Sequence, residues 1–74
     1  MSFAPHERVA LTSSLLASLR YSPQATLQVE FRSGAIYRYF TVPRAVVEGL
    51  RTADSAGAYF NRHLRNRFPC QRLL

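Results

Sequence analysis

Apolar and polar residues alternate strictly in the middle of the chain. Three apolar residues alternate there with three polar ones: Leu27, Gln28, Val29, Glu30, Phe31 and Arg32. In a β-strand, this pattern places the apolar side chains on one face and the polar side chains on the other. We therefore expect a strand over residues 25–32, followed after a short turn by another strand over residues 35–41.

The turn between these two strands decides which residues face each other. A two-residue loop would put Arg38 beside Val29, so that a cation would lie among core residues at a high desolvation cost. A type I turn closed by Gly34 in the left-handed conformation avoids this cost. It pairs Phe31 with Ala35, Val29 with Tyr37, and Leu27 with Tyr39. We prefer this second register, which leaves Arg38, Ile36 and Phe40 on the opposite face.

A looser alternation precedes the hairpin. Leu15, Ala17 and Leu19 share one side of a segment over residues 13–21, and polar residues follow in a turn at 22–24. We expect this segment to be the first strand of an antiparallel meander of three strands.

The first helix is predicted to begin at Pro43, because proline at the first helical position has a fixed φ that suits a helix. Three apolar residues then form a stripe on one side: Val46, Leu50 and Ala53. Three charged residues lie on the other side with ion-pair spacing: Arg44, Glu48 and Arg51. Gly49 weakens this helix by roughly 1 kcal/mol relative to alanine, so we expect docking to stabilise it.

The second helix is predicted to follow a cap at Asp54 or Ser55 and to run to about Arg67, before Pro69 stops it. Its buried stripe repeats every four residues: Ala56, Phe60, Leu64 and Phe68. The predicted fold is therefore α+β, with a three-stranded antiparallel meander followed by two helices packed on one of its faces.

Length and composition restrict the class of protein. A chain of 74 residues with 47% hydrophobic residues forms one small domain with little room for a deep cavity. We expect a flexible N-terminus over residues 1–10, the domain over residues 11–68, and a C-terminal tail over residues 69–74. The single cysteine and the absence of a long apolar run suggest a soluble protein of the cytoplasm, with no membrane contact.

Across most of its length, the chain resembles the KTSC family. The resemblance runs from Leu11 to Phe68 and consists of LxVxFxxGxxYxY, then VP, then AxSxGxYFN and LR. This family is named for the C-terminal region of some lysyl-tRNA synthetases and also occurs as small free-standing bacterial and phage proteins. The resemblance implies RNA as a partner, through the synthetase context, and it supplies no catalytic residue.

The charge of the chain also suggests a polyanion as partner. All ten basic residues are arginines, and four acidic residues leave a formal net charge of +6. Arginine binds phosphate bidentately and stacks on rings, although a codon bias of the genome accounts equally well for this composition. If the charge serves recognition, the guanidinium groups should gather on one outer side of the domain.

The candidate nucleic-acid-binding residues fall on two surfaces. The exposed side of the second helix and its C-terminal end supply Tyr59, Asn61, Arg62, Arg65 and Arg67, with Arg72 beyond them. The open face of the hairpin supplies Arg32 and Arg38. Cations near a helix C-terminus also favour the helix dipole, which is a sufficient structural reason for them. We expect the rings of Tyr37 and Tyr39 to belong to the core.

Catalysis is not expected from this sequence. The two histidines and one cysteine lack the spacing of a zinc site, and the four acidic residues form no carboxylate pair. We expect no cofactor. The preferred function is therefore a small, non-catalytic RNA-binding module, with structured or single-stranded RNA such as tRNA as partner. The alternative is a protein-interaction module or homodimer that uses the sheet face with Ile36 and Phe40.

Overall fold

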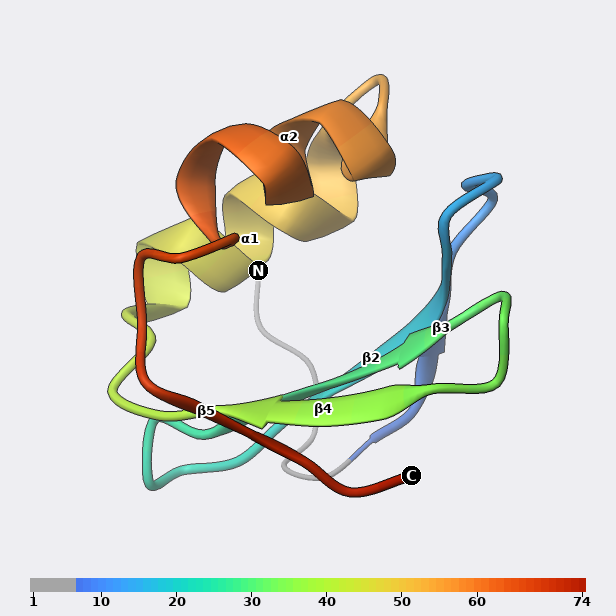
Figure 1. Ribbon diagram of the computed structural model, residues 1–74. Coiled ribbons are helices and arrows are strands. Elements are labelled where there is room, and N and C mark those ends of the chain that lie inside the picture. Colours follow the sequence, from blue (N-terminus) through green and yellow to red (C-terminus); the bar gives the residue numbers. More distant parts are fainter. Residues whose placement is uncertain (1–6) are drawn as a thin grey trace.

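The computed structural model describes residues 7–74, which form one antiparallel sheet with two helices on one side (Figure 1). Its five strands lie side by side in chain order: β1 (Val9–Ala10), β2 (Leu16–Tyr21), β3 (Leu27–Phe31), β4 (Ile36–Tyr39) and β5 (Cys70–Arg72). The helices α1 (Arg44–Thr52) and α2 (Ala56–His63) come between β4 and β5 in the chain. The α+β class is confirmed, but the predicted count of three strands is too low, because each end of the described chain adds an edge strand.

The hairpin of β3 and β4 has the predicted register. Its cross-strand partners include Leu27 with Tyr39, Val29 with Tyr37, and Glu30 with Ile36. The backbone N–H of Phe31 donates to the carbonyl oxygen of Ala35 over 2.8 Å. Gly34 closes the turn with a φ of 96°, a left-handed conformation that costs glycine little. The alternating apolar residues consequently face the helices.

A bulge in β2 changes the side on which its residues lie. The register with β3 shifts between Leu16 and Ser18, so that one residue is inserted there. Leu16 and Leu19 are both buried although they are three positions apart, whereas Leu15 is 37% exposed. The predicted grouping of Leu15 with Leu19 is wrong, because the bulge interrupts the alternation.

The expected C-terminal tail is held against the sheet. In β5, Cys70 lies opposite Tyr39 and Arg72 lies opposite Tyr37. The backbone N–H of Phe40 donates to the carbonyl oxygen of Pro69 over 2.9 Å. At the other end of the chain, residues 1–6 of the expected flexible N-terminus lie outside the described residues, while Val9–Ala10 pairs with β2. Backbone pairing thus extends the sheet at both edges.

The first turns of both helices follow from their caps. Pro43 is the N-cap of α1 and not its first helical residue, and its carbonyl oxygen accepts from Val46 and Val47. In α2, the Ser55 hydroxyl accepts from the backbone N–H of Ala58 over 3.2 Å, as one of the two predicted caps. The fully buried residues of α1 are Val47 and Leu50. Leu50 was predicted to be buried, but Val47 is buried in place of the predicted Val46.

Helix α2 ends at His63, four residues earlier than predicted. The backbone N–H groups of Leu64 and Arg65 both donate to the carbonyl oxygen of Phe60, which closes the last turn. Asn66 then adopts a φ of 60°, outside the helical region. The segment with Arg65 and Arg67 is therefore a turn that leads from α2 into β5.

Aromatic rings join α2 to the sheet. The ring of Phe60 packs edge-on against Phe31 and Tyr39, with centroids 5.3 and 5.8 Å apart. The buried aliphatic residues around this contact include Leu16, Leu19, Leu27, Val29, Val42, Val47, Leu50 and Leu64. Burial of these side chains is the main force that holds the helices on the sheet.

Neither helix within residues 7–74 is long and apolar enough to cross a membrane.

Candidate functional site

The arginines do not gather on one side of the domain. Arg38 lies opposite Gln28 on the sheet face that the helices leave open, whereas Arg72 lies opposite Tyr37, whose ring is on the helix side. The expectation of a single basic side is therefore wrong. The arginine side chains differ in what they contact.

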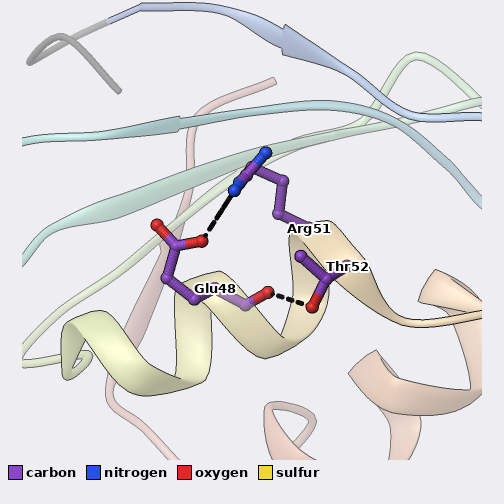
Figure 2. A network of polar contacts seen from close by, with 3 residues as sticks. All are labelled: Glu48, Arg51 and Thr52. Atoms are coloured by element: carbon purple, nitrogen blue, oxygen red, sulfur yellow. Dashed lines mark hydrogen bonds and ion pairs between the residues drawn. The ribbon is translucent and has the colours of Figure 1, made fainter. Parts of the chain in front are cut away.

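Two arginines form ion pairs with carboxylates. Arg51 and Glu48 lie one turn apart on α1, with a shortest N–O distance of 2.9 Å (Figure 2). The hydroxyl of Thr52 donates to the backbone carbonyl of Glu48 on the same turn. Arg8 lies 3.7 Å from Glu30. These pairs explain the two arginines without a ligand, and the predicted ion-pair spacing on the first helix is confirmed for Arg51.

Arg32 holds two segments of the chain together. Its Nε donates to the carbonyl oxygen of Ser13 over 2.9 Å, and its Nη2 donates to that of Leu11 over 2.7 Å. The loop before β2 is thereby fastened to the turn of the β3–β4 hairpin. Since these contacts give Arg32 a structural role, we leave it out of the proposed interface.

An aromatic groove opens between the end of α2 and strands β3 to β5 of the sheet, with a volume of about 400 Å³. It is lined by Leu15, Phe31, Ser33, Ala35, Tyr37, Tyr39, Phe60, Arg65, Asn66, Phe68 and Cys70. The early end of α2 creates this groove, because the turn at Asn66 carries the chain away from the helix axis and across to β5. We call this set of residues the aromatic groove.

Tyr37 is the central ring of the aromatic groove. Its ring stacks on Tyr39 with centroids 6.3 Å apart and an interplanar angle of 24°, and it meets Phe31 edge-on at 5.7 Å. The guanidinium carbon of Arg72 lies 5.7 Å from the Tyr37 centroid, within the range of a cation–π contact. The groove therefore combines flat apolar surfaces with a cation at its edge.

The two tyrosines of the hairpin differ in exposure. Tyr39 is only 5% exposed, which confirms its predicted place in the core, whereas Tyr37 is half-buried and lines the aromatic groove. Burial raises the pKa of Tyr39 to about 12; Cys70 and Tyr37 add to the rise, and Arg65 opposes it. The positive charge of Arg65 thus lowers the pKa of Tyr39, which also lines the groove.

The remaining predicted residues lie apart from one another. Arg62 lines a separate hollow with Tyr59 and His63, while Arg65 lines the aromatic groove. Asn61 is exposed on α2, and Arg67 is exposed in the turn that follows it. Of the predicted set, the structure therefore brings two arginines to the aromatic residues: Arg65, which lines the groove, and Arg72, which lies over the ring of Tyr37. The ring of Tyr59 instead contacts His63 on the same helix, with ring centroids 4.4 Å apart.

Sequence reasoning missed several residues of the aromatic groove. Phe68 was expected to continue a helix stripe. Arg72 was a candidate for phosphate contact, but it was placed in a tail beyond the helix and not beside Tyr37. Phe68 lines the groove, and Arg72 lies over the ring of Tyr37 because β5 pairs with β4. The acid-free stretch of residues 61–74, with its four arginines, indicated this part of the chain but gave no signal for the place of Phe68.

Ligands for a metal ion are not gathered in the part of the chain that the structure describes. Within residues 7–74, no three side chains of the His, Cys, Asp or Glu types lie close enough to hold a metal ion. The groups that face the aromatic groove are rings, two aliphatic side chains, a guanidinium, an amide, the Ser33 hydroxyl and the Cys70 thiol. Stacking and anion pairing are the interactions that such a set provides.

Comparison with known proteins identifies related domains. The model of the KTSC domain family matches residues 12–68. A crystal structure of a KTSC domain protein from Yersinia pestis is similar, with a TM-score of 0.87 and 28% identity, over 92% of this chain and 97% of that one. An uncharacterised protein of Stutzerimonas stutzeri is 59% identical over 56 residues, which cover 74% of this chain and 79% of the relative.

A larger enzyme contains a similar segment. The lysine–tRNA ligase of Nostoc sp. (strain PCC 7120) is 43% identical to this chain over 61 residues. That match covers 81% of this chain and 11% of the ligase. The chain is therefore similar to a small part of the ligase, and most of the ligase has no counterpart in it.

Proposed function

Because the chain belongs to the KTSC domain family, we propose that it is a non-catalytic RNA-binding module whose aromatic groove takes an unpaired stretch of RNA. A related domain forms part of lysine–tRNA ligases, which act on an RNA substrate. A small domain attached to such an enzyme, and present also as a small separate protein, suits a role in holding RNA. The residues of the aromatic groove supply the chemistry for this role.

The observation that carries the proposal is the placement of two arginines around one accessible ring. Arg65 lines the aromatic groove, and Arg72 lies over the ring of Tyr37. A base stacked on an aromatic side chain contributes roughly 1–3 kcal/mol, whatever its identity. Guanidinium groups beside that ring pair with the phosphates on either side of the base. The groove thus suits single-stranded RNA with little preference for sequence.

The local charge supports a polyanion at this groove. Residues 61–74 include four arginines and no acidic residue. The ion pairs Arg8–Glu30 and Arg51–Glu48 belong to other segments, so they do not neutralise these four arginines. Contact with about three to five phosphates would give a log–log salt dependence near −0.7 per phosphate for a single strand.

The experiment that tests this proposal is a titration of the full chain with a short fluorescent single-stranded RNA at low salt. We expect saturable binding that weakens with salt, and NMR amide shifts that concentrate in residues 35–39 and 64–72. A titration that shows no affinity at low salt would overturn the proposal. Shifts confined to the open sheet face would overturn the groove as the RNA site.

The alternative prediction, assembly through Ile36 and Phe40, has weaker support. Both side chains are only partly exposed, and Arg38 lies between them on the same face. The large apolar residues that are exposed within residues 7–74 are Leu15, Leu73 and Leu74. Light scattering at several protein concentrations separates the two functions, since a module that binds RNA as a monomer needs no self-association.

A further inference from the structure

A second hollow lies on the sheet face opposite the helices. Its volume is about 310 Å³, and it is lined by Arg20, Ser22, Gln24, Thr26, Gln28, Arg38 and Phe40. We call it the open-face hollow. None of these residues lines the aromatic groove. The two sites are therefore built from different side chains and can be tested separately.

Two arginines flank the centre of the open-face hollow. Arg20 lies opposite Gln28 on β3, and Gln28 lies opposite Arg38 on β4, so the three form one row across the sheet. Strands are spaced about 4.8 Å apart, which places the two arginine backbones about 10 Å from each other. Long guanidinium side chains at this separation can both reach one group bound between them. The Nη2 of Arg38 already lies 3.5 Å from the Gln28 amide oxygen.

A buried hydroxyl belongs to the same hollow. Ser22 is only 7% exposed and lines the hollow next to Thr26, to whose carbonyl oxygen its backbone N–H donates over 2.9 Å. Its side-chain oxygen is buried and has no hydrogen-bond partner among the described residues. A buried hydroxyl without a partner carries a desolvation penalty, and a bound acceptor would remove it. This hydroxyl is the second observation, besides the arginines, that points to a ligand.

The donors of the open-face hollow outnumber its acceptors. Two guanidinium groups, two amides and two hydroxyls line it, and no carboxylate does. The nearest acid along β3 is Glu30, which is engaged by Arg8 at 3.7 Å and by the Ser18 hydroxyl at 3.2 Å. The hollow itself, with two guanidinium groups and no carboxylate, suits a single oxyanion with several acceptor oxygens.

From these observations we infer that the open-face hollow binds a mononucleotide, through its phosphate monoester and its ring. The phosphate lies between Arg20 and Arg38, whose forks match its oxygens. Ser22 donates to the same group. Phe40 supplies a flat wall for the base, and the volume is at the lower end of the range of small-ligand sites.

The test is an NMR titration of the full chain with AMP, compared with adenosine and with inorganic phosphate. We expect AMP to shift the amides of residues 20–28 and 38–40, and to bind at least tenfold more tightly than adenosine. The substitutions Arg20→Gln and Arg38→Gln should each weaken AMP binding about tenfold or more. Arg62→Gln removes the same charge outside the hollow and should leave AMP binding within twofold of the unmodified chain.

Ser22→Ala separates a ligand role from a structural one. Since its hydroxyl has no partner in the described protein, the substitution should leave the melting temperature unchanged or raise it, while AMP binds more weakly. The inference is overturned if 10 mM AMP produces no localised shifts, if adenosine binds as well as AMP, or if the shifts fall on the aromatic groove. The inference is also overturned if Arg62→Gln weakens AMP binding as much as Arg38→Gln does. RNA binding by the groove is tested separately, by the titration with single-stranded RNA.

Discussion

The ring of Tyr59 in α2 ends against the backbone of Gly49 in α1, where the two helices meet. A Cβ atom placed on Gly49 would overlap the hydroxyl oxygen and the adjoining ring carbon of Tyr59. The glycine that weakens α1 in isolation is therefore the position that allows α2 to approach closely. The sequence indicates its cost to the helix but not the contact that it permits.

We predict that Gly49→Ala destabilises the domain, although alanine is the better helix former. The overlap with Tyr59 forces the ring or the helix to move, and such overpacking typically costs about 1–3 kcal/mol. Because the added Cβ atom overlaps several atoms of Tyr59, we expect a cost above the lower end of this range, and therefore above the gain of about 1 kcal/mol in helix propensity. Urea unfolding followed by circular dichroism measures the net change in the free energy of unfolding.

The matched control is the same substitution in a chain that carries Tyr59→Ala. With the ring absent, Gly49→Ala should stabilise the domain, because only the gain in helix propensity remains. A double-mutant cycle that shows no coupling between the two positions would contradict the contact as the reason for the glycine.

Arg32 should contribute to stability and not to ligand binding. Its guanidinium donates to the backbone carbonyl oxygens of Ser13 and Leu11, and hydrogen bonds from a charged group contribute roughly 1–3 kcal/mol. We expect Arg32→Ala to lower the free energy of unfolding by about this amount, and to leave RNA affinity per folded molecule within twofold. A large loss of RNA affinity in a fully stable variant would show that Arg32 contacts RNA.

Stability should fall at high pH because of Tyr39. Its pKa is raised to about 12 in the folded domain, chiefly by burial, from an ordinary value of 10 in the unfolded chain. The folded state therefore holds this proton more tightly, so its contribution is complete below pH 10 and is lost as the pH rises from 10 to 12. The expected loss is at most about 3 kcal/mol.

Tyr39→Phe provides the control for this pH dependence. The free energy of unfolding of the variant should decrease less between pH 9 and 11.5 than that of the unmodified chain. The difference between the two absorbance titrations at the tyrosinate band should have its midpoint near pH 12. Identical slopes of stability against pH would show that Tyr39 ionises in the folded domain as it does in the unfolded chain.

Local patterns predicted the centre of the fold correctly. The β3–β4 register follows from the cost of placing Arg38 among apolar residues, together with the turn that Gly34 permits. The Ser55 cap follows from the preference of free helical N–H groups for a side-chain acceptor. Both features depend on residues close to one another in sequence, where few arrangements compete.

Long-range contacts produced the features that the sequence did not predict. Strand β5 has the sequence CQR, with no alternation of apolar residues, and it exists because β4 offers an unpaired edge. The end of α2 depends on the left-handed conformation of Asn66, which asparagine adopts more readily than most residues but does not require. The bulge before Ser18 also gives no sequence signal of its own.

The candidate site was predicted by residue type more than by position. The arginine-rich C-terminal quarter was identified, and Arg65 does line the aromatic groove. Arg62 and Tyr59 were grouped with it because the helix was expected to continue to residue 67, which would have aligned them on one face. Arg72 reaches Tyr37 through a strand pairing that connects distant parts of the chain.

The most direct test of RNA binding by the aromatic groove compares Arg65→Gln with Arg62→Gln. Both arginines are exposed, both variants lose one positive charge, and the two positions are three residues apart, but only Arg65 lines the groove. The affinities of both variants for one fluorescent single-stranded RNA are measured at low salt, with folding checked by circular dichroism. We predict that Arg65→Gln weakens binding about tenfold, or 1.4 kcal/mol, and that Arg62→Gln weakens it less than threefold. Equal losses would show that RNA is attracted by overall charge alone and would contradict the groove as its binding site.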